Sequence, residues 1–413
     1  MTSHFSPDFF IGNRQKLRLS LTKGEVIVCT ASGNLQRSGD TTYPFSQDRN
    51  FWYLTGIDEP DIVLVITDSD EYLILSESDE IREVFDGAVN PTELSARSGI
   101  GLVYSQQEGW LKLKTQLQLG ATVATISPAP VRYRHGAFYV NPARRQLVQR
   151  LRRIARNTEF IDIRTQLAKL RAVKQPSEQA AIAKAVRITT ETLGELRTAD
   201  RLESFRHEYE LEAAISNGFR SRGAAGHAYS PIIASGNHAT TLHYVTNSGA
   251  MEQGGLTVVD VGAEVEYYAA DITRTLSTSE PTKRQGEVLA AVGSVQQQSL
   301  ALLTPGILLE DYEQTVATAM GEALVSLGLS ADREDRIALR QYYPHATSHF
   351  LGLDVHDVGD YQAPLEPGMV LTCEPGIYIP EEGIGVRLED DVIITAAGAR
   401  NLSADCAYDA YVL

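Results

Sequence analysis

The chain has 413 residues, 43% hydrophobic and 22% charged, and 37 basic against 53 acidic residues give a formal net charge of −16. This length and composition predict two or three globular domains, and the acidic balance argues against general binding of nucleic acid. No apolar run approaches the ~20 residues that cross a bilayer, no export signal is visible, and three widely spaced cysteines fit a reducing compartment, which together predict a cytoplasmic protein without membrane contact.

The N-terminal part of the chain, about 150 residues, mixes strand and helix patterns. Glu25–Cys29 is a β-branched run and predicts a strand. Ile62–Thr67 and Tyr72–Leu75 flank the polar sequence Asp68-Ser69-Asp70, which predicts a β-hairpin.

A basic helix is expected to follow. Asn141 and Pro142 form a helix start, with the asparagine as N-cap and the proline at the first helical position. Apolar residues then recur at helical spacing at Leu147, Val148, Leu151 and Ile154. Arginines are concentrated between positions 132 and 156, and we interpret them as a solvated helix face or a contact with an acidic neighbouring subunit.

A second unit is predicted to begin near Lys174–Pro176, where proline ends one helix and Ser177 opens another. The buried face of that helix is expected to contain Ile182, Val186, Leu193 and Leu196, and that of the next helix Tyr209, Leu211, Ile215 and Phe219. Strands and glycine-rich turns follow from Ser230, interrupted by helical stretches at 286–303 and 312–327. This order predicts an α+β fold with two domains, at 1–160 and 177–413, joined by a connecting segment at 161–176.

The strongest chemical signal lies in two apolar strand patterns around Asp260 and Asp271. If the hairpin loop centres between Val265 and Glu266, the two aspartates face each other across the ladder. Directly opposed carboxylates repel, and a bound cation would remove that conflict. Solvated strand ends are the alternative, but the apolar flanks of both aspartates make it the weaker interpretation.

Further chemistry-bearing residues are concentrated near the C-terminus. Three of the nine histidines, His345, His349 and His356, fall within twelve residues. A β-like run then delivers Glu374 into a Pro-Gly turn. Val386, Leu388, Val392 and Ile393 predict one strand, in which the acidic run that starts at Glu389 would be costly unless satisfied.

Two aspartates, two glutamates and one histidine form a hard, oxygen-rich ligand set: Asp260, Asp271, His349, Glu374 and Glu389. Such a set suits Mn²⁺, Co²⁺, Fe²⁺ or a pair of Zn²⁺ ions better than a structural zinc site, which would use cysteine. Four carboxylates can neutralise two divalent ions, and such a pair can activate a water and polarise a carbonyl.

These motifs resemble those of the pita-bread metallopeptidases, and most of all aminopeptidase P, the Xaa-Pro aminopeptidases, with prolidase as the nearest relative. The resemblance rests on Asp260–Ala263, Asp271–Thr275, His345–Asp357, Glu374–Tyr378 and Gly385–Asp391. In the N-terminal part, Tyr43–Gly56 and the following Asp58–Asp61 resemble the N-domain signature of aminopeptidase P. The segment from Ser235 to Tyr244, with His243, resembles the substrate-binding histidine block of the family.

The resemblance implies a dinuclear centre with Mn²⁺ as the expected ion, ahead of Co²⁺, Zn²⁺ or Fe²⁺. Asp271 and Glu389 would bridge two ions, Asp260 would complete one ligand shell, and His349 and Glu374 would complete the other. A bridging hydroxide would attack the scissile carbonyl, and Glu374 or the bridging pair would handle its proton.

The resemblance also implies residues that bind substrate. His243 and His356 match the pair of histidines that would contact the oxyanion and the Xaa carbonyl. His345, Tyr378 and Arg387 match positions near the proline side of the substrate. Cys373, beside Glu374, is interpreted as a buried small hydrophobic residue.

The implied function is hydrolysis of the bond between an N-terminal residue and a following proline, with such peptides as partners and a homodimer or homotetramer as the assembly. The alternative enzyme is a prolidase, which cleaves only Xaa-Pro dipeptides. A metal-free binding module of the same fold is the alternative from another class, and the presence of all five ligands argues against it.

Overall fold

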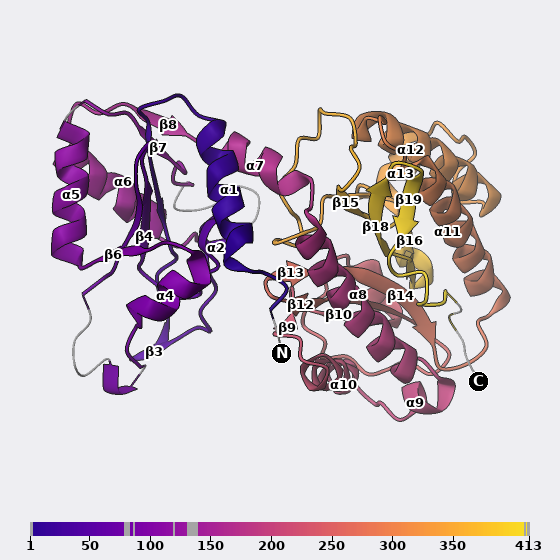
Figure 1. Ribbon diagram of the computed structural model, residues 1–413. Helices are drawn as coiled ribbons and strands as arrows, with labels where there is room; N and C mark the ends of the chain where they lie inside the picture. The colour runs from indigo at the N-terminus through magenta and orange to yellow at the C-terminus, as the bar shows by residue number, and fades with distance from the viewer. Residues whose placement is uncertain are drawn as a thin grey trace. The chain divides into compact units, whose positions relative to one another are not determined.

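The computed structural model describes residues 3–77, 83–85, 87–118, 120–129, 139–408 and 410 (Figure 1). The chain divides into two compact units, Met1–Leu170 and Arg171–Leu413. This division falls within helix α7 (Arg164–Ala172), inside the stretch expected to connect the domains. Each unit mixes helices with sheets, so the predicted α+β class is confirmed.

Unit 1 contains short strands between amphipathic helices. Its elements are α1 (Pro7–Leu19), β1 (Val26–Thr30), β2 (Gln36–Ser38), β3 (Thr41–Thr42), α2 (Arg49–Thr55), β4 (Val63–Ile66), β5 (Glu71–Ile74), α4 (Pro91–Ser98), β6 (Leu102–Tyr104), α5 (Gln106–Gln118), β7 (Val123–Thr125), α6 (Ala143–Ile154) and β8 (Phe160–Asp162). The first of its strands and the hairpin β4–β5 confirm the two strand predictions made for this part of the chain.

The main sheet of unit 1 has the strand order β6-β5-β4-β1-β7-β8. Antiparallel pairing joins β1, β4 and β5, whereas β6, β7 and β8 are added in parallel. Helices α5 and α6 cover one face of the sheet, and α1 and α2 lie on the other (Figure 1). Trp110, Leu113, Leu147 and Leu151 from α5 and α6 pack into one core with the sheet.

The basic helix α6 begins one residue later than predicted, at Ala143, with Pro142 as its N-cap. The side chain of Asn141 still accepts the backbone N–H of Ala143 at 3.1 Å, so the asparagine satisfies a free donor of the first turn as expected. Among the arginines of this region, Arg144 pairs with Asp48, and Arg132 and Arg134 lie outside the described residues.

Unit 2 holds the candidate site. Its elements are α8 (Pro176–Leu196), α9 (Ala199–Glu203), α10 (Glu208–Ser221), β9 (Gly226–His227), β10 (Ile232–Ser235), η1 (Gly236–Thr240), β11 (Leu256–Val261), β12 (Ala263–Val265), β13 (Tyr268–Ala269), β14 (Ile272–Ser277), α11 (Lys283–Leu302), α12 (Leu309–Ser326), α13 (Arg336–Tyr342), β15 (Val370–Cys373), β16 (Gly376–Ile379), η2 (Pro380–Glu382), β17 (Ile384–Arg387), β18 (Asp390–Thr395) and β19 (Gly398–Asn401). The helical stretches expected near 286–303 and 312–327 are therefore confirmed as α11 and α12.

Small antiparallel sheets frame the interior of unit 2. Their strand orders are β10-β11-β14, β13-β12-β9, β15-β18-β19 and β16-β17. Helices α11 and α12 contribute Val292, Tyr312 and Val316 to a large core that also includes Leu371, Val386 and Val392 from the strands. Because strands β15, β17 and β18 contribute side chains to this apolar core, the residues at the ends of these strands are held in place.

Three details of unit 2 differ from the sequence prediction. Helix α8 begins at Pro176, with Gln175 rather than Ser177 at its start. Tyr209 is 50% exposed, although it was expected on the buried face. It precedes the buried Leu211 by two residues, which corresponds to a rotation of about 200° around the helix axis and places Tyr209 on the solvent side. The single strand predicted through Val386 and Val392 is two strands, β17 and β18, which belong to different sheets.

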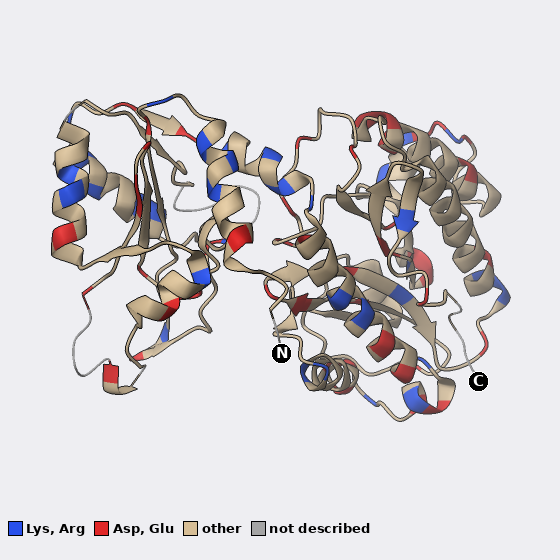
Figure 2. Ribbon diagram, in the orientation of Figure 1, with Lys and Arg blue, Asp and Glu red and all other residues tan. Residues whose placement is uncertain are grey.

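Acidic and basic residues both occur along α5 and α8, whereas α6 has only arginines and α12 only acidic residues as its charged groups (Figure 2). Within the described part of the chain, no helix combines the length and apolarity that a membrane span requires. The cysteines Cys29, Cys373 and Cys406 are all free and buried.

Candidate metal centre

The strands β11 and β14 place two of the candidate carboxylates. Their register sets Asp260 opposite Thr273, so the predicted direct pairing of Asp260 with Asp271 is wrong by two residues. The cause is the turn, because Glu266 and Tyr267 have φ values of 49° and 70°. Two consecutive positive φ angles are typical of a type I′ hairpin turn, and the turn is therefore centred one residue later than predicted.

Tyr229 joins the two aspartates. Its hydroxyl lies 2.6 Å from Oδ1 of Asp260 and 2.5 Å from Oδ1 of Asp271. One hydroxyl has one hydrogen to donate, so it can donate to only one of the two carboxylate oxygens that it contacts. Burial and the two aspartates raise the pKa of Tyr229 well above its ordinary value, which keeps the hydroxyl protonated. Sequence reasoning missed Tyr229, since a lone tyrosine before a strand has no distinctive pattern.

The acidic run from Glu389 to Asp391 is buried, and each carboxylate has its own partner. Glu389 accepts a 2.6 Å hydrogen bond from a threonine hydroxyl of β14. Asp390 forms a 2.7 Å ion pair with Arg274, and Asp391 accepts the backbone N–H of Asp271 at 3.0 Å. Each of the three buried carboxylates thus has a polar partner that offsets part of the free-energy cost of its burial. Of the three, Glu389 lines the cavity.

Glu374 follows the end of β15 as predicted, and His349 lies beside it. Nε2 of His349 is 3.3 Å from Oε1 of Glu374 and 3.5 Å from Oδ2 of Asp271. The hydroxyl of Thr372 donates to Glu374 and accepts the backbone N–H of His349, which fixes both residues. Nδ1 of His349 lies 3.1 Å from the carbonyl oxygen of Phe350, and donation there leaves Nε2 as the ligand atom.

The charges of this group interact strongly. Burial acts to lower the pKa of His349, but the hydrogen bond to Asp271 and the charge of Glu374 outweigh it and raise this pKa to about 9. Burial raises the pKa of Glu374 to about 7 and raises that of Glu389 well above its ordinary value. The carboxylates of the protein alone therefore retain protons, and divalent cations could replace them.

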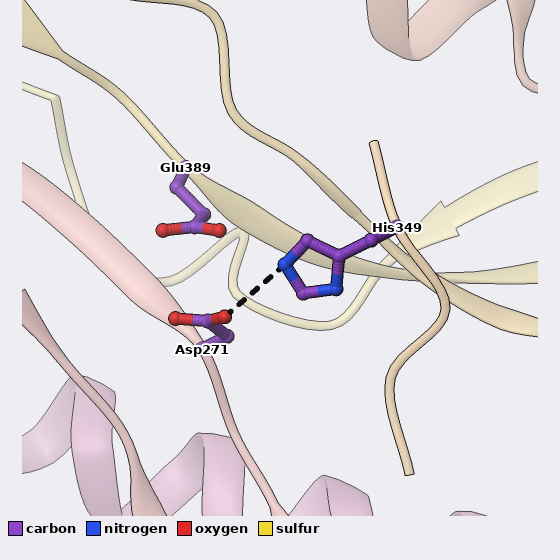
Figure 3. A group of neighbouring side chains, drawn as sticks. All are labelled: Asp271, His349 and Glu389. Carbon is purple, nitrogen blue, oxygen red and sulfur yellow. Dashed lines mark ion pairs between the residues drawn. The ribbon is translucent and has the colours of Figure 1, made fainter. Parts of the chain in front are cut away.

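The donor atoms fit a metal site. Asp271, His349 and Glu389 each offer one ligand atom, and these atoms lie within 4.8 Å of one another (Figure 3). Asp260 and Glu374 adjoin this trio, the first through the shared hydroxyl of Tyr229 and the second through His349. Oxygen and imidazole donors without thiolate suit hard or intermediate divalent cations. Asp391 accepts the backbone N–H of Asp271 with one oxygen, its other oxygen is buried without a hydrogen-bond partner, and burial raises the pKa of this carboxyl well above its ordinary value.

Arg387, Tyr378 and His345 form a hydrogen-bonded chain that ends on Asp260. Nη2 of Arg387 lies 2.5 Å from Oδ2 of Asp260, and Nη1 donates to the hydroxyl of Tyr378 at 2.9 Å. That hydroxyl is 2.9 Å from Nε2 of His345, whose Nδ1 lies 2.8 Å from the carbonyl oxygen of Ala346. Burial and the charge of Arg387 lower the pKa of His345 to about 4, so its neutral Nε2 accepts from the tyrosine.

These groups line one cavity of about 700 Å³ in unit 2. His243 and His356 are both exposed in its lining, and the ring of His356 meets that of His349 edge to face, with centroids 4.4 Å apart. The structure thus brings all ten predicted site residues to one cavity or, for Tyr378, into hydrogen bonding with its lining. The remainder of the lining is largely apolar and includes Ile232, Leu242, Val245, Val355 and Tyr361.

Comparison with known proteins defines the class. The model of metallopeptidase family M24 matches residues 180–396, so the chain belongs to this family and is a hydrolase. The model of the aminopeptidase P N-terminal domain matches residues 10–123. The predicted two-domain architecture, with a pita-bread C-terminal domain, is therefore confirmed.

Individual relatives are Xaa-Pro aminopeptidases. The Escherichia coli (strain K12) protein of that name is 34% identical over 430 residues, which cover 97% of this chain and 96% of the relative. The low-pH structure of E. coli aminopeptidase P has a TM-score of 0.86 and 32% identity, and covers 98% of this chain and 97% of that one. A zinc-substituted form of that enzyme in complex with product has a TM-score of 0.85 and 32% identity, and covers 99% and 97%. The family resemblance read from the sequence motifs is confirmed.

Proposed function

We propose that this protein is a dinuclear, metal-dependent aminopeptidase that hydrolyses the bond between an N-terminal residue and a following proline. The observation that carries the proposal is the convergence of four carboxylates and one imidazole in a cavity that also presents three further histidines. The Xaa-Pro activity in the names of its relatives supports the substrate class. The proposed substrates are peptides with proline in the second position.

Five residues are proposed to hold two cations, with Mn²⁺ as the expected ion: Asp260, Asp271, His349, Glu374 and Glu389. Asp271, Glu389 and His349 each have one ligand atom within 4.8 Å of those of the other two residues. Asp271 and Glu389 are assigned to both ions. Asp260 is assigned to one ion, and His349 with Glu374 to the other. When bound, such a pair would lower the pKa of a shared water to give a bridging hydroxide and would polarise the scissile carbonyl.

Glu374 is assigned the proton transfer. Its carboxylate lies 3.3 Å from His349 in the cavity, where it can accept a proton from the attacking water and return it to the leaving amine. The hydrogen bond from Thr372 holds the carboxylate in place while it changes protonation state. A fixed orientation matters because proton transfer requires hydrogen-bond distance to the reacting atom.

The histidines of the cavity wall are assigned to substrate. His243 and His356 can donate hydrogen bonds to the carbonyl oxygen, where negative charge develops in the transition state. The chain Arg387–Tyr378–His345 is assigned to the proline side, where its internal hydrogen bonds keep the three side chains in one arrangement. Because Arg387 also contacts Asp260, the metal ligands and this part of the pocket are mechanically linked.

A hydrolysis panel tests the proposal. The purified protein is freed of metal, reloaded with Mn²⁺, Co²⁺ or Zn²⁺, and assayed on Xaa-Pro-Xaa, Xaa-Pro and Xaa-Ala-Xaa peptides. We expect metal-dependent release of the first residue from Xaa-Pro-Xaa and little action on Xaa-Ala-Xaa. Cleavage of the dipeptide alone would indicate a prolidase, and failure to bind any of the ions would indicate a binding module.

The proposal extends to the location and the assembly of the protein. We propose a cytoplasmic location, which the three free, buried cysteines support, because such thiols persist in a reducing compartment. We also propose a homodimer or homotetramer, which light scattering coupled to size-exclusion chromatography would test.

A further inference from the structure

The segment that presents His243 to the cavity has little regular structure of its own. After β10 the chain forms the short helix η1 (Gly236–Thr240), and the following residues 241–249 form neither helix nor strand. Three of its side chains, Leu242, His243 and Val245, nevertheless line the cavity. Because no backbone ladder fixes these residues, their placement depends on contacts with a neighbouring element.

That neighbouring element is the start of α10, where Glu208 is completely buried. Its Oε1 accepts the backbone N–H of Ser235 at 2.9 Å and lies 2.8 Å from Nδ1 of His238. Its Oε2 accepts the hydroxyl of Tyr244 at 2.8 Å and the backbone N–H of Gly249 at 2.6 Å. One carboxylate therefore holds both ends of the segment and two points between them, and uses four acceptor positions to do so.

The contacts around Glu208 also fix the residue next to His243. The rings of His238 and Tyr244 stack with centroids 4.2 Å apart and an interplanar angle of 20°. Tyr244 directly follows His243, so its hydrogen bond to Glu208 sets where the backbone of His243 lies. Gly249 packs closely against both Glu208 and His238. A Cβ at this position would lie 2.4 Å from Cε1 of His238 and 2.9 Å from Oε2 of Glu208.

We propose that Glu208 is a positioning residue for His243, acting through residues 235–249 without reaching the cavity itself. The inference rests on the proposed function only for the role of His243 in hydrolysis. The sequence contains one indication of it: Glu208 precedes Leu211 by three residues and Ile215 by seven, so a glutamate occupies the apolar face of α10.

The first test measures hydrogen exchange in the metal-free protein and needs no activity. Glu208→Gln keeps the shape of the side chain but turns one acceptor oxygen into a donor. We expect backbone exchange within residues 236–249 to become at least tenfold faster and exchange in β11 and β14 to stay unchanged. Glu178→Gln is the matched control, because Glu178 is also buried near a helix start and accepts bonds from Tyr268 and Gln175, away from this segment.

The second test is a double-mutant cycle in the metal-loaded enzyme. Glu208→Gln should lower kcat/KM for an Xaa-Pro-Xaa peptide about tenfold in the otherwise unchanged protein, and less than twofold when His243→Ala is already present. Equal losses in both backgrounds, or unchanged exchange in residues 236–249, would overturn the inference. If the unchanged protein hydrolyses no peptide, the proposed function fails, and the exchange experiment still decides the role of Glu208.

A milder variant covers the case in which Glu208→Gln does not fold. Tyr244→Phe removes the hydrogen bond to Glu208, together with the 3.4 Å bond that the hydroxyl accepts from the backbone N–H of Ser248, and leaves the stacked ring in place, so exchange is compared at positions other than Ser248. Faster exchange confined to residues 236–249, together with a loss of kcat/KM that disappears in the His243→Ala background, supports the inference. Unchanged exchange in that segment contradicts it.

Discussion

Raising the pH should destabilise the metal-free protein, and divalent cations should remove this effect. Burial raises the pKa of Glu374 from its ordinary 4.5 to about 7 in the folded state. The folded protein then holds a proton that the unfolded chain has lost, so the contribution to stability is full below pH 4.5 and disappears as the pH rises to 7. The difference between the two pKa values corresponds to on the order of 3 kcal/mol in the free energy of unfolding.

His349 extends the same trend to higher pH. Its pKa rises from 6.5 to about 9, against the effect of burial, because Asp271 and Glu374 favour the charged imidazole. A raised pKa of a base also means extra proton binding by the folded state, so this contribution is full below pH 6.5 and is lost as the pH rises through 9. The two residues therefore act in the same direction, and stability should fall continuously from about pH 5 to pH 9.

The measurement is urea unfolding of the chelator-treated protein at one-unit steps from pH 5 to 9, with and without excess Mn²⁺. We expect the metal-free curve to fall by on the order of 6 kcal/mol, with similar contributions from the two residues, and the Mn²⁺ curve to be flat or rising, because cations replace the protons. Glu374→Gln should remove the part of the fall that Glu374 contributes, while Glu389 and His349, whose pKa values are also raised, retain the remainder. Glu366→Gln, exposed and outside the cavity, should retain the whole fall. Constant or rising stability of the metal-free protein over this range would refute the reasoning.

Three substitutions test other parts of the structure. Tyr229→Phe removes the hydroxyl between the two aspartates and should destabilise the metal-free protein by about 1–3 kcal/mol in urea unfolding, and no change would contradict the bridging contact. Gly262→Ala should cost roughly 4 kcal/mol or prevent folding, because its Cβ would lie 1.7 Å from the carbonyl oxygen of Ala270, and a normal melting temperature would disprove this. Cys373→Ala should leave kcat/KM within about twofold, since burial raises the pKa of this thiol and keeps it unreactive, and a large loss would instead indicate a catalytic thiol.

Much of the fold could be predicted from local patterns. Helical periodicity located α8, α11 and α12, and the polar turn between two apolar runs located the hairpin β4–β5. These features depend on neighbours within a few residues, which the sequence displays directly. The ligand candidates were also visible, because carboxylates flanked by apolar residues are costly unless something satisfies them, and because three of the nine histidines lie close together in the chain.

Two predictions about the strands of unit 2 were wrong, one about a hairpin register and one about where a strand ends. The β11–β14 register depends on the two positive φ angles of Glu266 and Tyr267, and nothing in those residue types demands them. The break between β17 and β18 follows from pairing with two different partner strands, which a continuous apolar pattern does not reveal. The turn is local, but its two residue types do not specify its conformation, whereas the break between the strands depends on hydrogen bonds to distant segments, which no local pattern displays.

The amino-acid sequence alone indicated which chemistry is possible here, since four carboxylates and a histidine in or beside apolar strands and turns suit divalent cations. Only the tertiary structure decided how these groups are held. Tyr229 between two aspartates, Arg387 against Asp260 and Glu208 behind His243 all join residues far apart in the chain. Such contacts are set by packing in three dimensions, because a buried polar group takes whichever partner the surrounding fold brings within hydrogen-bond distance.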